Sequence, residues 1–556
     1  MLLYREKDYK TTCIDLKNIY HENGIKIDVN GMCTEGIYSY NCRISGTDLY
    51  SNGKGILPVQ ACASSLAEMI ERLQNLTELS IKTKHLFNTD LIYWDTLMSY
   101  NELKNNSYSM LRCIFHNAEV LERVLDLLTQ VYSNLIPCNY YKGICDGEIY
   151  GIPIAISSVL YGTNGMSAGN SFDESIEYAK YEISERMVNK AVYYDQYDNY
   201  IRLNPSLMGI SKKVLDIINK IPYQVIFFMP QELTINVVGM LVLEKNSKKH
   251  IIKFGSHPNV LIAIERCVTE LFQGRSLDEL DKYMSFPKNK LDNFQDFHII
   301  FRSGEGGYLE DTIERILKSQ CNNCDSYTDK PQTLLSDNLL YRKLSFLGFP
   351  TVHCIIPAIS EVRLSTYAAI KDSINEGLIF KALIRLSKLN VKEKLSLLEM
   401  LIDYVVDWKQ PIKILLDLPI YDIDVLDYPI GFLMIGLGFQ VGDQNLFSAI
   451  IDKFDIVDIC SSINKSLFLD FSQLYFDNGN NVDKVKEYYR ELQNQDDFNV
   501  MYDIYKQSID TILNFPYMNC YRCYECEIQT NCKYKHTIEF YKKILNVEAK
   551  NEQNQN

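Results

Sequence analysis

Residues 53–74, GKGILPVQACASSLAEMIERLQ, place a Gly-Lys-Gly turn directly before an amphipathic segment. On an α-helix, at about 100° per residue, Glu68 lies about 40° and Glu71 about −20° from Ser64. Arg72, at about 80°, falls in the same sector. The opposite side of the helix is apolar and would pack against the hydrophobic core. The stretch therefore predicts a helix whose polar side chains share one face.

A second segment repeats this arrangement after the glycine-rich stretch TNGMSAGN, which contains Asn164. The helical pattern that follows carries Glu174, Glu182 and Glu185 within about 80° of one another. Arg186 comes directly after the last of these. The sequence thus predicts a second acidic helical face with an arginine beside it.

A third segment, AIERCVTELFQGR, offers Arg266, Glu270 and Gln273 within about 60° on helical spacing. Arg275 would point the opposite way on a continuous helix. It joins the group only if Gly274 ends the helix, as a C-terminal glycine commonly does.

Several carboxylates beside arginines and Lys54 require an explanation in terms of charge. Buried carboxylates repel one another and cost several kcal/mol to desolvate unless a cation neutralises them. Mg²⁺ prefers carboxylate oxygens and leaves positions open for phosphate, which Lys54 and the arginines would hold. The alternative is that each segment is a solvated helix face with neighbouring salt bridges. Three copies with Gly- and Asn-rich leaders favour a shared site.

These motifs resemble the YcaO-domain family, especially its stand-alone members. The spacing Ser-X3-Glu-X2-Glu-Arg is similar to the first family signature, and NGMSAGN with its following glutamates is similar to the second. FGSHPNVLIAIERCVTELFQGRSL resembles the third, and IIPAISEV, near Pro357, resembles a late proline-containing strand of the family. The resemblance covers roughly residues 1–375 and includes three spaced motifs in the family's order.

The resemblance implies an enzyme that binds ATP and Mg²⁺ and phosphorylates an amide oxygen of a peptide. The implied magnesium ligands are Glu68, Glu71, Glu182 and Glu185. The implied catalytic residues are Glu71, Glu185 and Arg186. The implied nucleotide-binding residues are Lys7 and Thr12 of the N-terminal segment, together with Lys54, Ser64, Arg72, Asn164, Glu174, Arg266, Glu270, Gln273 and Arg275.

The fold expected is α+β, because strand-like segments, among them IYGIPIAI at residues 149–156, alternate with the motif helices. Residues 1–375 would form a YcaO-type domain of helices packed on an antiparallel or mixed sheet. Residues 376–510 would form an all-α domain, with a tetratricopeptide-like repeat as one reading and a plain helical support as the other. Residues 511–545 form a Cys-rich segment and residues 546–556 a disordered tail.

The segment NCYRCYECEIQTNCKYKH places four cysteines at the spacing C-X2-C-X2-C-X5-C. Its latter part is similar to the cysteine pattern of SPASM-type iron–sulfur segments. Four thiolates suit Zn²⁺ equally, and unmetallated or disulfide-bonded cysteines are the third alternative. The predicted ligands for a [4Fe-4S] cluster or Zn²⁺ are Cys520, Cys523, Cys526 and Cys532.

The expected product is open. The chain ends NEQNQN, without the proline-rich end common among azoline-forming members, so sulfur insertion to a thioamide is slightly favoured. An azoline-forming cyclodehydratase with a separate partner is the alternative. A third reading is a non-catalytic ATP-binding adaptor that assists methylthiolation of a ribosomal protein.

Composition limits the partners. With 57 basic and 71 acidic residues, a net charge of −14 makes free nucleic acid an unfavourable partner. No signal-peptide core or membrane-length apolar run is evident, so the chain is expected to be cytoplasmic. The expected partners are a peptide or protein substrate and a TfuA-like or other sulfur-delivery protein. The resemblance also implies a homodimer.

Overall fold

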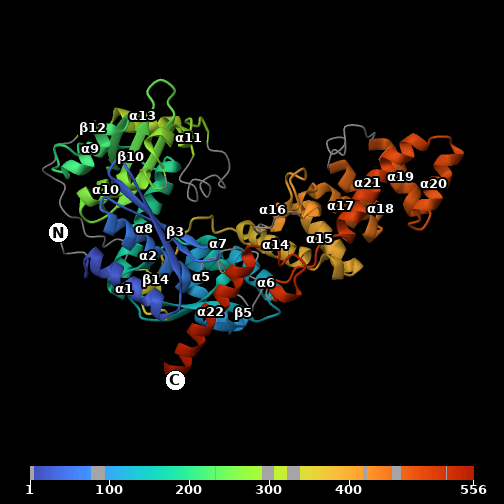
Figure 1. Ribbon diagram of the computed structural model, residues 1–556, viewed down its shortest axis with the longest axis horizontal. Coiled ribbons are helices and arrows are strands. Elements are labelled where there is room, and N and C mark those ends of the chain that lie inside the picture. The colour runs from blue at the N-terminus through green and yellow to red at the C-terminus, as the bar shows by residue number, and fades with distance from the viewer. Residues whose placement is uncertain are drawn as a thin grey trace. The chain divides into compact units, whose positions relative to one another are not determined.

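The computed structural model describes residues 5–76, 94–231, 233, 235–273, 275–290, 306–321, 338–416, 423–453, 465–520 and 522–555. The chain divides into two compact units. The N-terminal unit comprises residues 1–82, 92–371 and 541–556, and the helical unit comprises residues 83–91 and 372–540. Figure 1 shows the elements of both units along the chain.

The first sheet of the N-terminal unit is antiparallel and has the order β1 (Ile27–Thr34), β2 (Ile37–Ile44), β3 (Tyr50–Gly55). Helices α1 (Tyr9–Glu22) and α2 (Pro58–Gln74) pack against each other, and α2 lies on β2 and β3. Helix α2 begins at a proline, whose fixed φ suits the first turn. Its apolar face is buried as the sequence predicts, with the residues Leu66, Met69, Ile70 and Leu73.

The second sheet has the order β11-β10-β9-β8-β12. Its strands are β8 (Tyr200–Leu203), β9 (Gln224–Pro230), β10 (Val237–Leu243), β11 (His250–Ser256) and β12 (Gln320–Cys321), and β12 pairs with β8 in parallel. Every residue of β10 is buried, because the strand is covered on both faces. Alternate β10 side chains pack with α10 (Val260–Leu271) and with the end of α8 (Phe172–Tyr193).

The third sheet has the order β4-β5-β13-β14-β7, with β6 paired to β5. Its strands are β4 (Thr96–Met98), β5 (Ile136–Gly143), β6 (Ile149–Pro153), β7 (Met166–Ala168), β13 (Leu340–Leu344) and β14 (Thr351–Ile355). The first half of α8 packs on this sheet through Ile176, Ala179 and Ile183. Helix α8 therefore packs on two sheets, with its first half on the third sheet and its end on the second.

The remaining helices of the N-terminal unit come between these strands along the chain. They are α4 (Tyr100–Asn106), α5 (Tyr108–Phe115), α6 (Ala118–Val131), α7 (Ile154–Leu160), α9 (Lys212–Lys220), α11 (Leu280–Tyr283) and α13 (Glu310–Lys318). The expected strand IYGIPIAI is half helix, since β6 ends at Pro153 and α7 starts there. Proline lacks the N–H that a continuing strand pairing needs, which explains the change.

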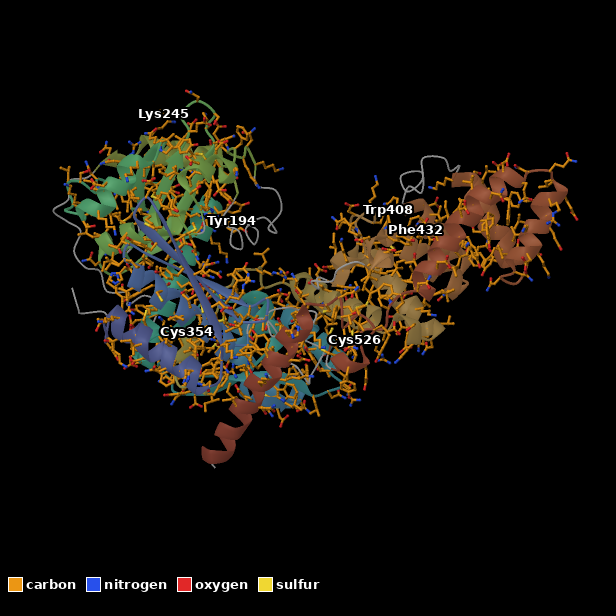
Figure 2. All side chains as sticks on the ribbon, viewed as in Figure 1. Tyr194, Lys245, Cys354, Trp408, Phe432 and Cys526 are labelled. Carbon is orange, nitrogen blue, oxygen red and sulfur yellow. The ribbon has the colours of Figure 1, made fainter. Side chains whose placement is uncertain are left out.

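The C-terminal helices are α14 (Tyr367–Leu383), α15 (Val391–Tyr404), α16 (Lys413–Leu416), α17 (Ile430–Val441), α18 (Gln444–Lys453), α19 (Lys465–Asp477), α20 (Val482–Glu491), α21 (Gln495–Leu513) and α22 (Tyr534–Gln555). Helix α17 packs with α15, α18 and α21, and its aromatic neighbours form the core. Figure 2 labels Phe432 of this helix and Cys354 of β14 in the other unit. A Cβ at Gly436 would lie 2.3 Å from Ser508 O, so glycine permits the close approach of α17 and α21.

The α+β class with a helical C-terminal region is confirmed. The tetratricopeptide-like repeat stays a prediction. Residues 546–555, expected to form a disordered tail, continue α22 as helix to Gln555. Lys, Glu, Gln and Ala in this stretch have favourable helix propensity, which accounts for the difference. Among the described residues, no helix is long and apolar enough to cross a membrane.

Candidate functional site

The Gly-Lys-Gly segment forms the end of β3, pressed against α2. A Cβ at Gly53 would lie 2.1 Å from Ala61 O and 2.1 Å from Ser65 N. Only glycine therefore allows β3 to approach the helix so closely. The next residue, Lys54, is thereby held beside the polar face of α2.

Lys54 connects the first and third motifs. Its ammonium group forms an ion pair with Glu270 and donates a hydrogen bond to Gln273 Oε1 at 2.9 Å. Gln273 Nε2 donates in turn to Asn52 O at 3.2 Å. The strand before α2 and the segment ending α10 are thus tied by side chains that the sequence predicted to meet.

The carboxylates of α2 face Arg72. Its NH2 group lies 3.3 Å from Glu68 Oε1, and its Nε lies 3.9 Å from Glu71 Oε1. Burial raises the pKa of Glu71 to about 8; Arg72 opposes the shift, and Glu182 and Glu68 add to it. Burial alone would lower the pKa of Arg72, but these three glutamates raise it overall.

Helix α8 contributes the second acidic face. Arg186 NH2 lies 3.4 Å from Glu182 Oε1. Burial raises the pKa of Glu182, Arg186 and Arg72 oppose the shift, and Glu185 adds to it. Glu182 of α8 thus raises the pKa of Glu71 in α2, and Arg72 of α2 opposes the rise at Glu182, which requires these groups to be close in space.

The pKa of Lys54 also shows that charged groups from separate segments lie close together. Burial lowers its pKa to about 8, Glu185 and Glu68 oppose the shift, and Arg186 and Arg266 reinforce it. Groups from all three predicted segments thus act on one ammonium. We call this set the acidic site: Lys54, Glu68, Glu71, Arg72, Glu182, Glu185, Arg186, Arg266, Glu270 and Gln273.

The third motif is held by its own strand–helix contact. A Cβ at Gly255 would lie 2.3 Å from Ala263 O, so β11 and α10 approach as closely as β3 and α2 do. Arg266 NH1 donates to Ser256 O at 2.8 Å, and its guanidinium lies 5.5 Å from the ring centroid of Tyr181. These contacts fix Arg266 between β11 and α8.

Arg275 follows the end of α10. The helix ends at Leu271 with Phe272 as its cap, and Gly274 lies outside the described residues. The guanidinium of Arg275 packs 4.5 Å from the ring centroid of Tyr283 in α11. A nucleotide contact of Arg275 stays a prediction.

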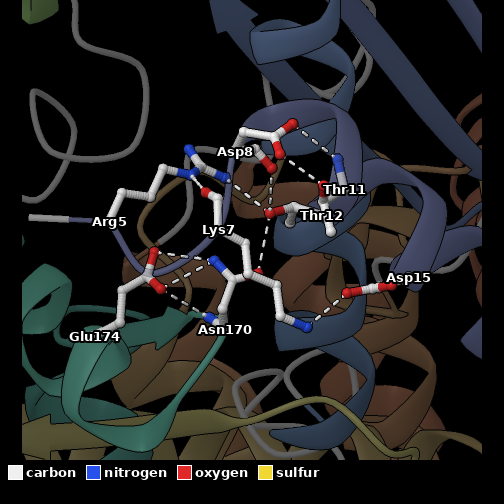
Figure 3. Close-up of polar contacts among 8 residues, drawn as sticks. All are labelled: Arg5, Lys7, Asp8, Thr11, Thr12, Asp15, Asn170 and Glu174. Carbon is white, nitrogen blue, oxygen red and sulfur yellow. Dashed lines mark hydrogen bonds and ion pairs between the residues drawn. The ribbon is translucent and has the colours of Figure 1, made fainter. Parts of the chain in front are cut away.

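The N-terminal segment meets the second motif (Figure 3). Thr12 Oγ1 donates to Asn170 Oδ1 at 2.9 Å, and Asn170 Nδ2 donates to Glu174 Oε2 at 2.9 Å. Arg5 NH2 donates to Thr12 Oγ1 at 3.3 Å. Thr12 and Glu174, both predicted to face the nucleotide, thus belong to one hydrogen-bonded chain through Asn170.

Three other predicted nucleotide residues have separate positions. Lys7 Nζ pairs with Asp15 Oδ2 at 2.7 Å on the outside of α1. Asn164 is 1% exposed, and its Nδ2 donates to Ser360 O at 2.7 Å, which holds two turns together. Ser64 is half-buried on α2. Their contacts with a nucleotide stay predictions.

Sequence reasoning missed several neighbours of the site. Arg5 opposes, and Glu174 favours, the rise in the pKa of Tyr178 that burial causes. His257 lies 5.3 Å from Tyr181 between ring centroids, and burial with nearby Arg266 lowers its pKa to about 4. A lone aromatic or histidine carries no spacing signal, so these residues were not predictable from the pattern.

The glutamates of the acidic site determine which metal ion it could hold. Glu71 and Glu182, whose pKa values are raised by burial and by neighbouring carboxylates, lie with Glu68 and Glu185 and supply the oxygen ligands that Mg²⁺ prefers, so the residues fit this ion. Within the described ranges, however, no three His, Cys, Asp or Glu side chains are already arranged to hold a metal. Glu68, Glu71, Glu182 and Glu185 therefore stay predicted ligands.

The same finding covers the C-terminal cysteines. Cys526 is buried, and Cys520, Cys523 and Cys532 are partly exposed. A short 3₁₀ helix, Cys523–Glu525, begins at the second of these cysteines and has the third, Cys526, as its C-cap. The predicted four-cysteine ligand set is not assembled in the described structure.

Comparison with known proteins gives a match over residues 52–360 to a family model described as a YcaO cyclodehydratase that binds ATP and Mg²⁺. An uncharacterized protein of Haemophilus influenzae is 30% identical over 255 residues. The ribosomal protein S12 methylthiotransferase accessory factor YcaO of Escherichia coli is 25% identical over 260 residues. Each match covers 42% of this chain and 42% of the relative.

Solved structures give similar matches at low identity. A heterocyclase in complex with substrate and cofactor is 15% identical, with a TM-score of 0.46 over 64% of this chain and 53% of the other. YcaO from Methanopyrus kandleri, bound with AMPPCP and Mg²⁺, is 15% identical, with a TM-score of 0.39 over 64% of this chain and 92% of the other.

Proposed function

Because this chain belongs to the YcaO family, we propose that it is an ATP- and Mg²⁺-dependent enzyme that activates an amide of a peptide or protein. The observation that carries the proposal is the acidic site, in which Lys54 is bonded to Glu270 and Gln273 and shares its environment with Glu68 and Glu185. Such a mixture of cations and carboxylates suits a metal–triphosphate complex.

Each charged group has a proposed task. Glu68, Glu71, Glu182 and Glu185 would hold Mg²⁺, which supplies charge neutralisation on the phosphates when bound. Lys54, Arg72 and Arg266 would neutralise further phosphate oxygens, while Arg186 would stabilise charge that develops during transfer. Thr12, Asn170 and Glu174 would orient the remainder of the nucleotide.

The proposed reaction moves the γ-phosphoryl group of ATP to the amide oxygen and releases ADP. The amide carbon then accepts a nucleophile, and phosphate leaves with the original oxygen. Sulfide as the nucleophile gives a thioamide, which we favour because a thiol-rich segment is present in the chain. A Cys, Ser or Thr side chain of the substrate, with a separate partner protein, gives an azoline instead.

The name of the Escherichia coli relative favours a second candidate function. In that case the chain would bind ATP as a non-catalytic adaptor and assist methylthiolation of a ribosomal protein. Retention of all the acidic-site residues speaks for catalysis, because an adaptor has no need of four crowded carboxylates.

Mass spectrometry distinguishes these functions. The protein is incubated with ATP, Mg²⁺, sulfide and candidate peptides, including a peptide of ribosomal protein S12. We expect a gain of about 16 Da for sulfur replacing oxygen, whereas a loss of about 18 Da indicates a ring. ATP turnover without a mass change in any peptide would contradict peptide activation, and no turnover at all would favour the adaptor.

The C-terminal cysteines carry a separate proposal. Cys520, Cys523, Cys526 and Cys532 would hold a [4Fe-4S] cluster or Zn²⁺ by rearranging around the metal as it binds. Anaerobic purification followed by metal analysis and visible absorption tests this. Brown colour with iron indicates the cluster, zinc without colour indicates the other metal, and neither metal contradicts the proposal.

Assembly is also part of the proposal. We propose a cytoplasmic homodimer that receives sulfur from a TfuA-like or other delivery protein. Light scattering on the purified chain measures its mass directly, and a monomer at micromolar concentration would contradict the dimer. Co-purification with a partner encoded beside the chain tests the delivery step.

A further inference from the structure

Two cysteines outside the acidic site, Cys13 and Cys62, lie on the packed helices α1 and α2. Cys13 is 7% exposed, and its Sγ donates to Val59 O at 3.5 Å, one turn before Cys62 on α2. The thiols of Cys13 and Cys62 each shift the pKa of the other, so the two groups lie close together at this contact. Helices α1 and α2 pack against each other, so Cys13, which contacts Val59 of α2, lies at this helix contact one turn from Cys62.

The two thiols differ in chemistry. The neighbouring thiol of Cys62 raises the pKa of Cys13 strongly. The thiol of Cys13 in turn lowers the pKa of Cys62 to about 7; burial opposes that shift, and the ammonium group of Lys17 adds to it. Cys62 is also partly exposed. An accessible cysteine beside a cation is a reactive nucleophile, and its buried neighbour is placed to resolve the product.

The other cysteines of the N-terminal unit serve as internal comparison. Burial raises the pKa values of Cys42 and Cys354 to about 12, as expected for inert thiols of the core. Cys33 and Cys113 are exposed. In contrast to these cysteines, Cys62 is partly exposed and lies beside the buried thiol of Cys13.

We propose that Cys13 and Cys62 form a peroxide-sensitive modification site at which the thiols of α1 and α2 are oxidised reversibly to an intramolecular disulfide. The Cys62 thiolate attacks one oxygen of hydrogen peroxide, the O–O bond breaks, and sulfenic acid and hydroxide form. The Cys13 thiol then attacks this sulfur and displaces the oxygen, which leaves as water after taking up a proton. Two thiols and one peroxide thus give one disulfide and two waters, and a dithiol reverses the reaction.

The two cysteines are close in sequence to residues that are proposed to bind the nucleotide. Thr12, bonded to Asn170, directly precedes Cys13, and Ser64 follows Cys62 by two residues. A covalent link between α1 and α2 would restrict both. This consequence for ATP rests on the proposed function, whereas formation of the disulfide does not.

Tryptic peptide mapping of the full-length protein tests the site, since cleavage gives residues 11–17 and residues 55–72 with one cysteine each. After hydrogen peroxide and alkylation, we expect these peptides to be linked, with a mass about 2 Da below the sum of the reduced pair. Dithiothreitol should separate them. Unlinked peptides, or Cys62 linked instead to Cys42, would overturn the proposal.

Variants assign the roles. In Cys13→Ala we expect dimedone to trap sulfenic acid at Cys62, and in Cys62→Ala we expect Cys13 to stay reduced. Cys113→Ala, which alters an exposed cysteine of α5, is the matched control and should form the linked pair as the wild type does. Sulfenic acid appearing at Cys13 but not at Cys62 would contradict the assignment. Circular dichroism confirms that each variant is folded.

Discussion

At the scale of single residues, Glu71 shows how surroundings set the chemistry of a carboxyl group. Its side chain is 13% exposed, and burial, Glu182 and Glu68 raise its pKa from 4.5 to about 8, against the opposing effect of Arg72. The folded protein therefore holds a proton here more tightly than the unfolded chain does. The stability that this proton contributes is fully present below about pH 4.5 and is lost as the pH rises through about 8.

Glu71→Gln removes this titration while keeping the shape of the side chain. Between about pH 5 and about pH 9, without divalent ions, we expect the free energy of unfolding of the wild type to fall by roughly 3 to 5 kcal/mol relative to the variant. Urea unfolding at several pH values measures it. Glu177→Gln, at an exposed position of α8, is the matched control, and parallel curves for wild type and Glu71→Gln would contradict the account.

Lys54 tests the phosphate side of the site. Lys54→Met removes an ammonium group bonded to Glu270 and Gln273, so we expect ATP affinity to fall about tenfold or more. Equilibrium binding of ATP with Mg²⁺ measures the change. Lys220→Met removes a surface lysine paired with Glu35 and should leave the affinity unchanged. Equal affinities in the two variants would show that Lys54 does not meet phosphate.

At the scale of elements, the close approach of β3 and α2 places the first motif. In Gly53→Ala the added Cβ would collide with the backbone of Ala61 and Ser65, which cannot move without shifting the helix. We expect a loss of about 3 kcal/mol or more in the free energy of unfolding. Gly55→Ala, the matched control, meets only the side chain of Gln60 and should cost about 1 kcal/mol or less. Similar losses in both would show that β3 is not confined by α2.

The motif helices could be predicted from the sequence because helical spacing alone puts their carboxylates on one face. The buried apolar face of α2 followed from the same reasoning. The meeting of Lys54 with Glu270 and Gln273 did not, because helical spacing relates residues of one helix only; a shared site was inferred from charge and from the family resemblance. Spacing could not predict that Arg5 would join Thr12 and Asn170, since such contacts depend on the tertiary path of the chain. Spacing also predicted a strand through residues 149–156, whereas the strand ends at Pro153 and α7 begins at Ile154.

At the scale of the whole molecule, the chain leaves the N-terminal unit at residue 371 and rejoins it at residue 541. This return could not be predicted from a change in local composition, because it depends on packing between residues far apart in the sequence. Tyr541 and Ile544 in α22 are buried, although the segment before them reads as polar and cysteine-rich. The end of the chain is thus part of the N-terminal unit's fold.

Tyr541→Ala tests this return. Tyr541 is fully buried, so we expect its truncation to lower the free energy of unfolding by about 3 kcal/mol or more. Tyr524→Ala, at a position that is 74% exposed, is the matched control and should change it by less than about 0.5 kcal/mol. Thermal and urea unfolding measure both. Equal stability of the two variants would contradict the burial of the chain's end.

The proposed function requires that three separate segments bring their carboxylates together around one metal–nucleotide complex. Calorimetric titration of ATP into wild type and into the double variant Glu71→Gln, Glu185→Gln, with and without Mg²⁺, measures this most directly. We predict that wild-type binding requires Mg²⁺ and that the double variant binds at least about a hundredfold more weakly with the metal present. Wild-type affinity that is unchanged by removing Mg²⁺, or by the two substitutions, would contradict it.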